Sequence, residues 1–135
     1  MIKKIKHIGL KSLHKKAWGL QSKYKRMSSA DKNGYVKCYT CDGLHKWQEL
    51  DLGHYIHLNA LDFEPDNLRP QDTYCNRYKH GNSGVYAENL IKEIGVKRVE
   101  RLRELEREYK AHPRQFKVGE LEEIITTYQD LLKTL

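Results

Sequence analysis

The sequence predicts an α+β fold in which helices frame a small, irregular core stabilised by a metal ion. Apolar residues recur at helical spacing near both ends of the 135-residue chain, a pattern typical of amphipathic helices. Residues 35–84 lack this period and are rich in Cys, His, Asn, Gly and aromatic residues, with strand-like runs only at about 50–57 and 67–71. We therefore divide the chain into a basic helical arm (1–34), a metal-stabilised core (35–84) and a helical C-terminal region (85–135).

The N-terminal arm combines an apolar seam with a dense positive charge. The seam consists of Leu10, Leu13, Ala17, Leu20, Tyr24 and Met27. Residues 1–30 contain nine Lys and Arg side chains and no acidic one, whereas the rest of the chain has 16 basic and 18 acidic residues. Such a block binds polyphosphate by releasing counterions, so we expect DNA contact; the alternative is a helix whose charge only keeps the protein in solution. The predicted DNA contacts are Lys11, Lys15, Lys16, Lys23, Lys25 and Arg26 of the arm, with Arg77 and Lys79 of the core.

Composition argues against a membrane protein. No apolar run approaches the ~18 residues that a membrane span needs. The N-terminus lacks the apolar stretch of a signal peptide, and three cysteines in such a chain fit a reducing compartment better than a disulfide scaffold. We therefore expect a cytoplasmic protein.

The C-terminal region is predicted to contain two helical segments. The first runs over about 85–110, is interrupted at Gly95 and is ended by Pro113. The second begins near residue 118 and carries a wide apolar face. We expect this last helix to pack on the 96–110 segment, or across subunits of a two-fold homodimer.

Three cysteines of the core form a candidate zinc site. Cys38 and Cys41 are spaced so that both thiolates of one tight turn can bind a tetrahedral metal, and Cys75 is the natural third ligand. Asp72 stands three residues before Cys75 and is one candidate for the fourth ligand; His45 is the other. Zinc would replace the apolar core that such a loop-rich segment cannot build. The alternative is a set of three small thiols without metal.

The segment that contains these ligands also carries polar residues in the order expected for a ββα-metal nuclease, also called an HNH or His-Me finger nuclease. These residues are Asp51, His54, Asn67, Asn76 and His80. A histidine at the end of the first strand, His54, can take a proton from water. Asn67 can hold the His54 ring or the backbone beside it. Gly53 indicates a bulge or a close approach of backbone that brings Asp51 towards His54. The candidate ligands for a catalytic Mg²⁺ or Mn²⁺ are Asp51, Asn76 and His80, whereas His57 is expected at an exposed strand end, the alternative being a phosphate contact.

Residues 35–100 resemble the phage NinG/Rap family of recombination endonucleases. The resemblance rests on the cysteine pair, the D-x-G-H-Y string that starts at Asp51, the C-N-R-Y-x2-G-N string that starts at Cys75, and the I-G-x-K-R-V run that starts at Ile94. It implies a phage-encoded, structure-selective endonuclease of branched DNA such as Holliday junctions, D-loops and flaps. It also implies His54 as the general base, Asp51 and Asn76 at the catalytic metal, and zinc on the cysteines. Asp72 departs from the family pattern, which has a cysteine there.

Two other functions remain open from the sequence. One is a zinc-stabilised DNA- or RNA-binding module without catalysis, in which the histidines and asparagines are structural. The other is an HNH nuclease that cuts linear duplex DNA. A binding module has no need for Asp51, His54 and Asn76 to point at one place, so the convergence of these three side chains distinguishes it from a nuclease.

Overall fold

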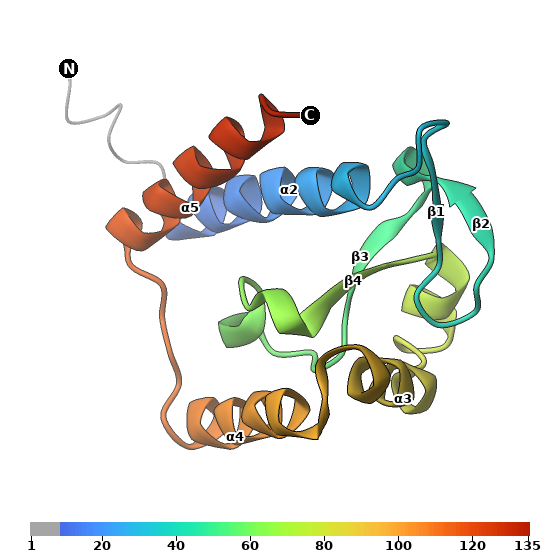
Figure 1. Cartoon of the computed structure of the whole chain (residues 1–135). Coiled ribbons are helices and arrows are strands. Elements are labelled where there is room, and N and C mark those ends of the chain that lie inside the picture. Colours follow the sequence, from blue (N-terminus) through green and yellow to red (C-terminus); the bar gives the residue numbers. More distant parts are fainter. Residues whose placement is uncertain (1–8) are drawn as a thin grey trace.

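The structure is a computed structural model that describes residues 9–135. Its elements form three tiers (Figure 1): α2 (Leu10–Ser28) and α5 (Val118–Leu132) on one side, the strands in the middle, and α3 (Ser83–Ile94) and α4 (Val96–Ala111) on the other. The predicted α+β class is therefore confirmed. None of the helices within 9–135 has the length and apolarity that a membrane crossing requires.

Helices α2 and α5 pack face to face and bury a first core. Leu13 and Ala17 of α2 lie against Leu121 and Ile125 of α5, and all four side chains are buried. The last helix therefore packs on the N-terminal helix, and the prediction that it packs on the 96–110 segment was wrong. The segment between α4 and α5 carries the chain from one side of the molecule to the other (Figure 1), which puts α5 beside α2 and away from α4.

A second core joins the middle of the chain to α3 and α4. Its buried members are Ile56, Leu61, Tyr86, Leu90, Val99 and Leu102. The Tyr86 hydroxyl donates a 2.9 Å hydrogen bond to the carbonyl of Gly53, which satisfies this buried group and ties α3 to the strands. Gly95 separates α3 from α4 with a φ of +88°, so the break predicted there is confirmed.

The middle tier consists of two short antiparallel pairs. Strands β1 (Tyr35–Lys37) and β2 (Leu44–Lys46) form a hairpin, and β3 (Asp51–His54) pairs with β4 (Leu68–Gln71). Strand β3 is shorter than the predicted run of 50–57, because the chain turns away after His54 and the buried Asn67 side chain holds the Ile56 backbone. The close approach predicted at Gly53 is present without a bulge: a Cβ at this position would lie 1.8 Å from Oε1 of Gln71.

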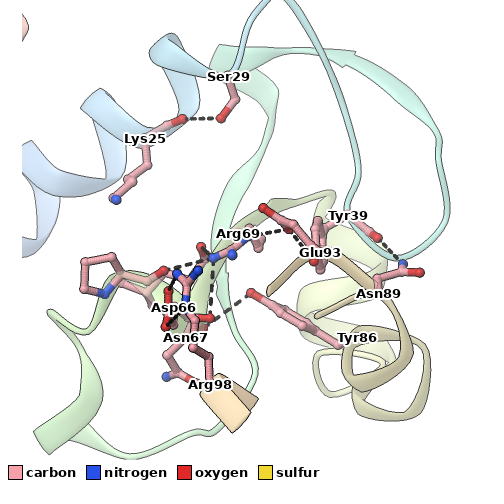
Figure 2. Close-up of polar contacts among 12 residues, drawn as sticks. Lys25, Ser29, Tyr39, Asp66, Asn67, Arg69, Tyr86, Asn89, Glu93 and Arg98 are labelled. Atoms are coloured by element: carbon pink, nitrogen blue, oxygen red, sulfur yellow. Dashed lines mark hydrogen bonds and ion pairs between the residues drawn. The ribbon is translucent and has the colours of Figure 1, made fainter. Parts of the chain in front are cut away.

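Polar contacts attach β4 to the helices on its far side (Figure 2). Arg69 donates to Glu93 of α3, and the Tyr39 hydroxyl donates to the same carboxylate at 2.6 Å. Arg98 of α4 pairs with Asp66. These contacts hold α3 and α4 against the strands and leave the opposite face of β3 to α2.

Candidate active site and metal centre

The three cysteines and Asp72 come together at one end of the strands. Cys38 and Cys41 lie on the turn between β1 and β2, while Asp72 and Cys75 follow β4. Their four ligand atoms all lie within 4.8 Å of one another, so the group could hold a metal ion. His45 lies nearby, with Nε2 3.6 Å from the Asp72 carboxylate, but is not a member of this group. The geometry favours Asp72 as the fourth ligand.

Backbone hydrogen bonds shape the turn that carries Cys38 and Cys41 and affect the pKa values of the two thiols. The Cys38 amide donates to the carbonyl of Gly43 at 2.8 Å, and Asp42 adopts a left-handed conformation with a φ of +61°. Burial acts to raise the pKa of Cys38, but hydrogen bonds from the backbone of Asp72 and Thr40 outweigh it and lower that pKa. Without a metal, burial and the hydrogen bond to Asp72 raise the pKa of Cys41 to about 12. A metal would replace the proton that Cys41 shares with Asp72.

A cleft of about 1120 Å³ opens between α2 and β3 and forms a second, separate site. Residues of α2, β3 and the turn at Tyr74–Tyr78, a π-helical turn, line it together with residues of the segment before α5. Its cationic side chains outnumber its carboxylates. The cations are Lys11, Lys15, Arg26, Arg77 and Arg114, and the carboxylates are Asp51 and Asp62. A surface of this sign favours a phosphate-bearing ligand.

His54 lies in the wall of this cleft and is held on two sides. Its Nε2 is 2.8 Å from Oδ1 of Asp62. The indole of Trp18 stacks on its imidazole, with ring centroids 4.9 Å apart and the planes within 5°. The second carboxylate oxygen of Asp62 is 2.7 Å from Nε2 of His14. One carboxylate thus joins a histidine of α2 to the predicted general base.

Asp51 and Asn76 are brought together in the same cleft. The Asn76 side-chain amide donates to Oδ2 of Asp51 at 3.0 Å, which leaves the Asn76 amide oxygen available to a ligand. Arg77 also contacts Asp51, at 3.3 Å, although 67% of the Arg77 side chain is exposed. The carboxylate and amide oxygens are of the type that Mg²⁺ and Mn²⁺ prefer. They could hold such an ion.

Asn67 acts on backbone rather than on the histidine ring. It is fully buried, and its side chain accepts from the Ile56 amide at 2.8 Å and donates to the Ile56 carbonyl at 2.9 Å. Its own carbonyl accepts from Tyr55. Asn67 therefore holds the chain directly after His54, one of the two roles predicted for it.

The two other histidines of this region are placed differently: His57 lines the cleft with His54, and His80 does not. The ring of His57 is 5.7 Å from that of His54, and burial together with the neighbouring His54 lowers the pKa of His57. His80 follows the π-helical turn in a left-handed conformation, with a φ of +51°, and does not line the cleft. The spacing of four from Asn76 therefore does not place His80 beside Asp51, because the helix assumed for that spacing has ended.

The predicted DNA contacts of the arm divide between different surfaces. Lys11 and Lys15 line the cleft, and Lys16 and Lys23 are exposed on α2 outside it. Arg26 donates to the carbonyls of Trp47 and Leu50, so its guanidinium is used within the protein. The remaining side chains are placed as follows: Lys25 is half-buried, with its pKa lowered by burial and by Arg69, while Arg77 and Lys79 are exposed. Lys3, Lys4 and Lys6 lie outside the described residues.

Three residues of the cleft wall were missed by sequence reasoning. Trp18 and His14 are four residues apart on α2 and therefore share one helical face, a signal that was available in the sequence. Asp62 lies in an irregular loop beyond the 3₁₀ turn Asn59–Leu61, where no periodicity identifies a functional side chain.

Fold and site together define a small α+β protein with a four-residue group that could hold a metal ion and a separate basic cleft lined by His, Asp and Asn. Residues 2–135 match the family described as "Bacteriophage Lambda NinG protein". The chain belongs to the NinG family of bacteriophage lambda-type proteins.

Curated relatives agree with this assignment. The chain is 35% identical over 103 residues to "Protein ninG" of Salmonella phage P22 and of Escherichia phage 933W, and 34% identical to that of Escherichia phage lambda. Each alignment covers 74% of this chain and 48% of the relative, so the chain spans about half the length of the curated relatives it matches. No solved structure was found to match the chain.

Proposed function

We propose that this protein is a metal-dependent endonuclease that hydrolyses phosphodiester bonds of branched DNA. The observation that carries the proposal is that His54, Asp51 and Asn76 all line one basic cleft. A nuclease needs these three side chains to lie together, whereas a binding module does not. Lys11 and Lys15 add positive charge to the wall formed by α2, which suits a polyphosphate substrate.

His54 acts as the general base in this proposal. Its Nε2 is engaged by Asp62, so Nδ1 is the ring nitrogen left to accept a proton from water. The water oxygen forms the new bond to phosphorus, the bond from phosphorus to the leaving sugar oxygen breaks, and that oxygen finally takes up a proton. Trp18 and Asp62 keep the imidazole in one orientation throughout.

Asp51 and Asn76 would hold a divalent cation, Mg²⁺ or Mn²⁺, which stabilises negative charge on the phosphate when bound. The hydrogen bond from the Asn76 amide nitrogen to Asp51 places these two side chains next to each other. Arg77, now paired with Asp51, is exposed enough to turn towards a phosphate once a cation takes its place. The group of Cys38, Cys41, Asp72 and Cys75 would hold a structural zinc ion.

Branched recombination intermediates are proposed as the substrate because of the resemblance to recombination endonucleases described above. Such enzymes act where several duplexes meet, and contacts to phosphates suit recognition by shape rather than by base sequence. A homodimer is part of the same proposal, because a four-way junction needs two symmetric cuts.

One observation favours the alternative of a binding module without catalysis. Asp51 is paired with Arg77 and accepts a hydrogen bond from Asn76, and a module that only binds DNA would have the same arrangement. The two functions differ in whether a phosphodiester bond is broken.

The test is a cleavage assay with a labelled four-way junction and its matching linear duplex, each with and without added Mg²⁺. We expect the wild-type protein to cut the junction only with Mg²⁺, and His54→Ala to bind the junction without cutting it. His112→Ala is the matched control, because His112 is exposed beyond the end of α4. Equal cutting of both DNAs indicates a nuclease of linear duplex, and binding by wild type without cutting over Mg²⁺ and Mn²⁺ indicates the binding module.

A further inference from the structure

Two adjacent tyrosines stand exposed beside the cleft. Tyr74 and Tyr78 are 61% and 74% exposed, the highest values among the large hydrophobic side chains of residues 9–135. Tyr86, by contrast, is fully buried and uses its hydroxyl to bond the Gly53 carbonyl. Exposed rings that stand singly are common on protein surfaces, but these two lie next to each other.

The π-helical turn presents the two rings on one side. The Lys79 amide donates to the Tyr74 carbonyl, five residues back, at 3.1 Å, and turns of this type are frequent at functional sites. The ring centroids of Tyr74 and Tyr78 lie 5.9 Å apart with the planes inclined by 30°. The rings therefore form two neighbouring but separate flat surfaces.

Positive charge is interleaved with these aromatic side chains. Residues 73–80 contain no acidic side chain. Arg77 and Lys79 flank Tyr78 in the sequence and are exposed. The Lys79 ammonium lies 5.5 Å from the centroid of the Tyr74 ring, within the range of a cation–π contact. Flat rings flanked by exposed cations suit the bases and the phosphates of one nucleic-acid strand.

The same turn is anchored to both sites described above. The Cys75 amide donates to Asp72 at 2.7 Å, and Asn76 donates to Asp51. Asn76 and Arg77 line the cleft, whereas the rings of their neighbours Tyr74 and Tyr78 are outside it. A strand held on the tyrosines therefore lies next to the residues proposed for catalysis.

We propose that Tyr74 and Tyr78 form a stacking platform for unpaired nucleotides of the DNA substrate. The inference rests on the proposed function and adds a physical reason for a preference for branched DNA. In a linear duplex, neighbouring base pairs cover both faces of each base, so no face is free for a tyrosine. Unpaired bases at a branch or in a single strand offer their faces, and stacking on aromatic side chains is insensitive to base identity.

The test measures binding, without added divalent ion, of a fluorescent single-stranded oligonucleotide, a four-way junction with unpaired bases at its centre, and a linear duplex. For the Tyr74→Ala/Tyr78→Ala double variant we expect the Kd for the single strand and the branched DNA to rise at least about tenfold, with less than a twofold change for duplex. The matched control is Tyr74→Phe/Tyr78→Phe, which keeps both rings and is expected to bind as wild type. A 2-aminopurine placed in the single strand reports stacking directly, by fluorescence quenching with wild type that the alanine variant loses.

The inference is overturned if the alanine variant binds the single strand as tightly as wild type, or if its affinity for duplex falls equally. It is also overturned if the alanine substitutions convert a dimer to a monomer, because the rings would then belong to a subunit contact. The assay involves no cleavage, so stacking without any nuclease activity would retain the platform and refute the proposed function. If the alanine variant binds DNA as wild type does and still cuts the junction normally, the platform is refuted and the proposed function is retained.

Discussion

Trp18 lies flat against His54: the indole of the N-terminal helix and the imidazole at the end of β3 are parallel within 5°, with centroids 4.9 Å apart. The basic arm is therefore a wall of the candidate active site as well as a source of positive charge. Removing residues 10–28 would expose Leu121 and Ile125 and take away the support of His54. For this reason single charge and ring substitutions, rather than truncation, are the way to test what the arm does.

Asp62 is expected to position His54 for catalysis. His14 and His54 contact different oxygens of Asp62, and in Asp62→Asn one of these oxygens is replaced by an NH2 donor that cannot accept from a histidine. We expect the single-turnover cleavage rate to fall about 10- to 100-fold, with the Kd for the junction unchanged. Asp66→Asn is the matched control, because Asp66 pairs with Arg98 away from the cleft. Weaker junction binding at an unchanged rate would assign Asp62 to DNA binding instead.

Lysines on two faces of α2 separate cleft binding from general charge attraction. Lys11→Gln/Lys15→Gln removes two cations from the cleft, whereas Lys16→Gln/Lys23→Gln removes two from the exposed face outside it. We expect the first pair to make the plot of log binding constant against log salt concentration less steep by about two, since each phosphate contact contributes about 0.9 to the steepness. The second pair should change the slope by less than half as much. Equal effects of the two pairs would show that the arm attracts DNA without directing it into the cleft.

The cysteine group is expected to hold one zinc ion that stabilises the fold. Cys41 is exposed, so Cys41→Ser removes a thiolate ligand without opening a cavity. We expect elemental analysis to find one zinc per wild-type chain and none in the variant. The melting temperature should fall by roughly 10 °C or more. Treating wild type with a chelator should reproduce the change and adding zinc should reverse it, while identical melting of metal-free and metal-loaded protein would contradict a structural role.

Acid should destabilise the protein through the carboxylates that hold α3 and α4. Burial acts to raise the pKa of Glu93, but hydrogen bonds from Tyr39 and Arg69 outweigh it and leave that pKa below its usual value. Arg98 lowers the pKa of Asp66. A carboxylate with a lowered native pKa stabilises the fold above its unfolded pKa, and this contribution is lost as the pH falls through the native value.

We therefore expect the free energy of unfolding to fall as the pH drops below about 4.3, the ordinary pKa of a Glu side chain. Glu93→Gln should be less stable than wild type at pH 6 and should lose less stability on acidification. Urea unfolding at pH 6 and at about pH 3 measures this difference. Glu104→Gln, on the exposed face of α4, is the control. An identical loss in wild type and Glu93→Gln would exclude this carboxylate as a source of the acid sensitivity.

Local features of the fold could be predicted because local forces determine them. The helical periods near both ends, the break at Gly95 and the positions of β3 and β4 follow from residues close together in the chain. The partner of α5 was mispredicted, because two amphipathic faces of similar hydrophobicity are both acceptable until the path of the connecting segment is known. The α2–α5 pair is determined by the whole chain.

The candidate site could be predicted only in part, for a related reason. Asp51, His54 and Asn76 were identifiable because their order and chemistry are distinctive. Asp62 reaches His14 across 48 residues from an irregular loop, and no local pattern indicates such a contact. His80 was misplaced because the turn before it is π-helical and His80 itself adopts a left-handed conformation.

The pairing of α2 with α5 affects the order in which the structure forms as well as its final shape. Tyr128 bonds Gln21 although 107 residues separate them, and contacts of such long separation form late because loop closure must come first. During synthesis α2 leaves the ribosome early, but Leu13 and Ala17 lack their partners Leu121 and Ile125 until α5 has followed. A nascent chain that still lacks α5 therefore lacks Leu121, one of the residues that line the cleft.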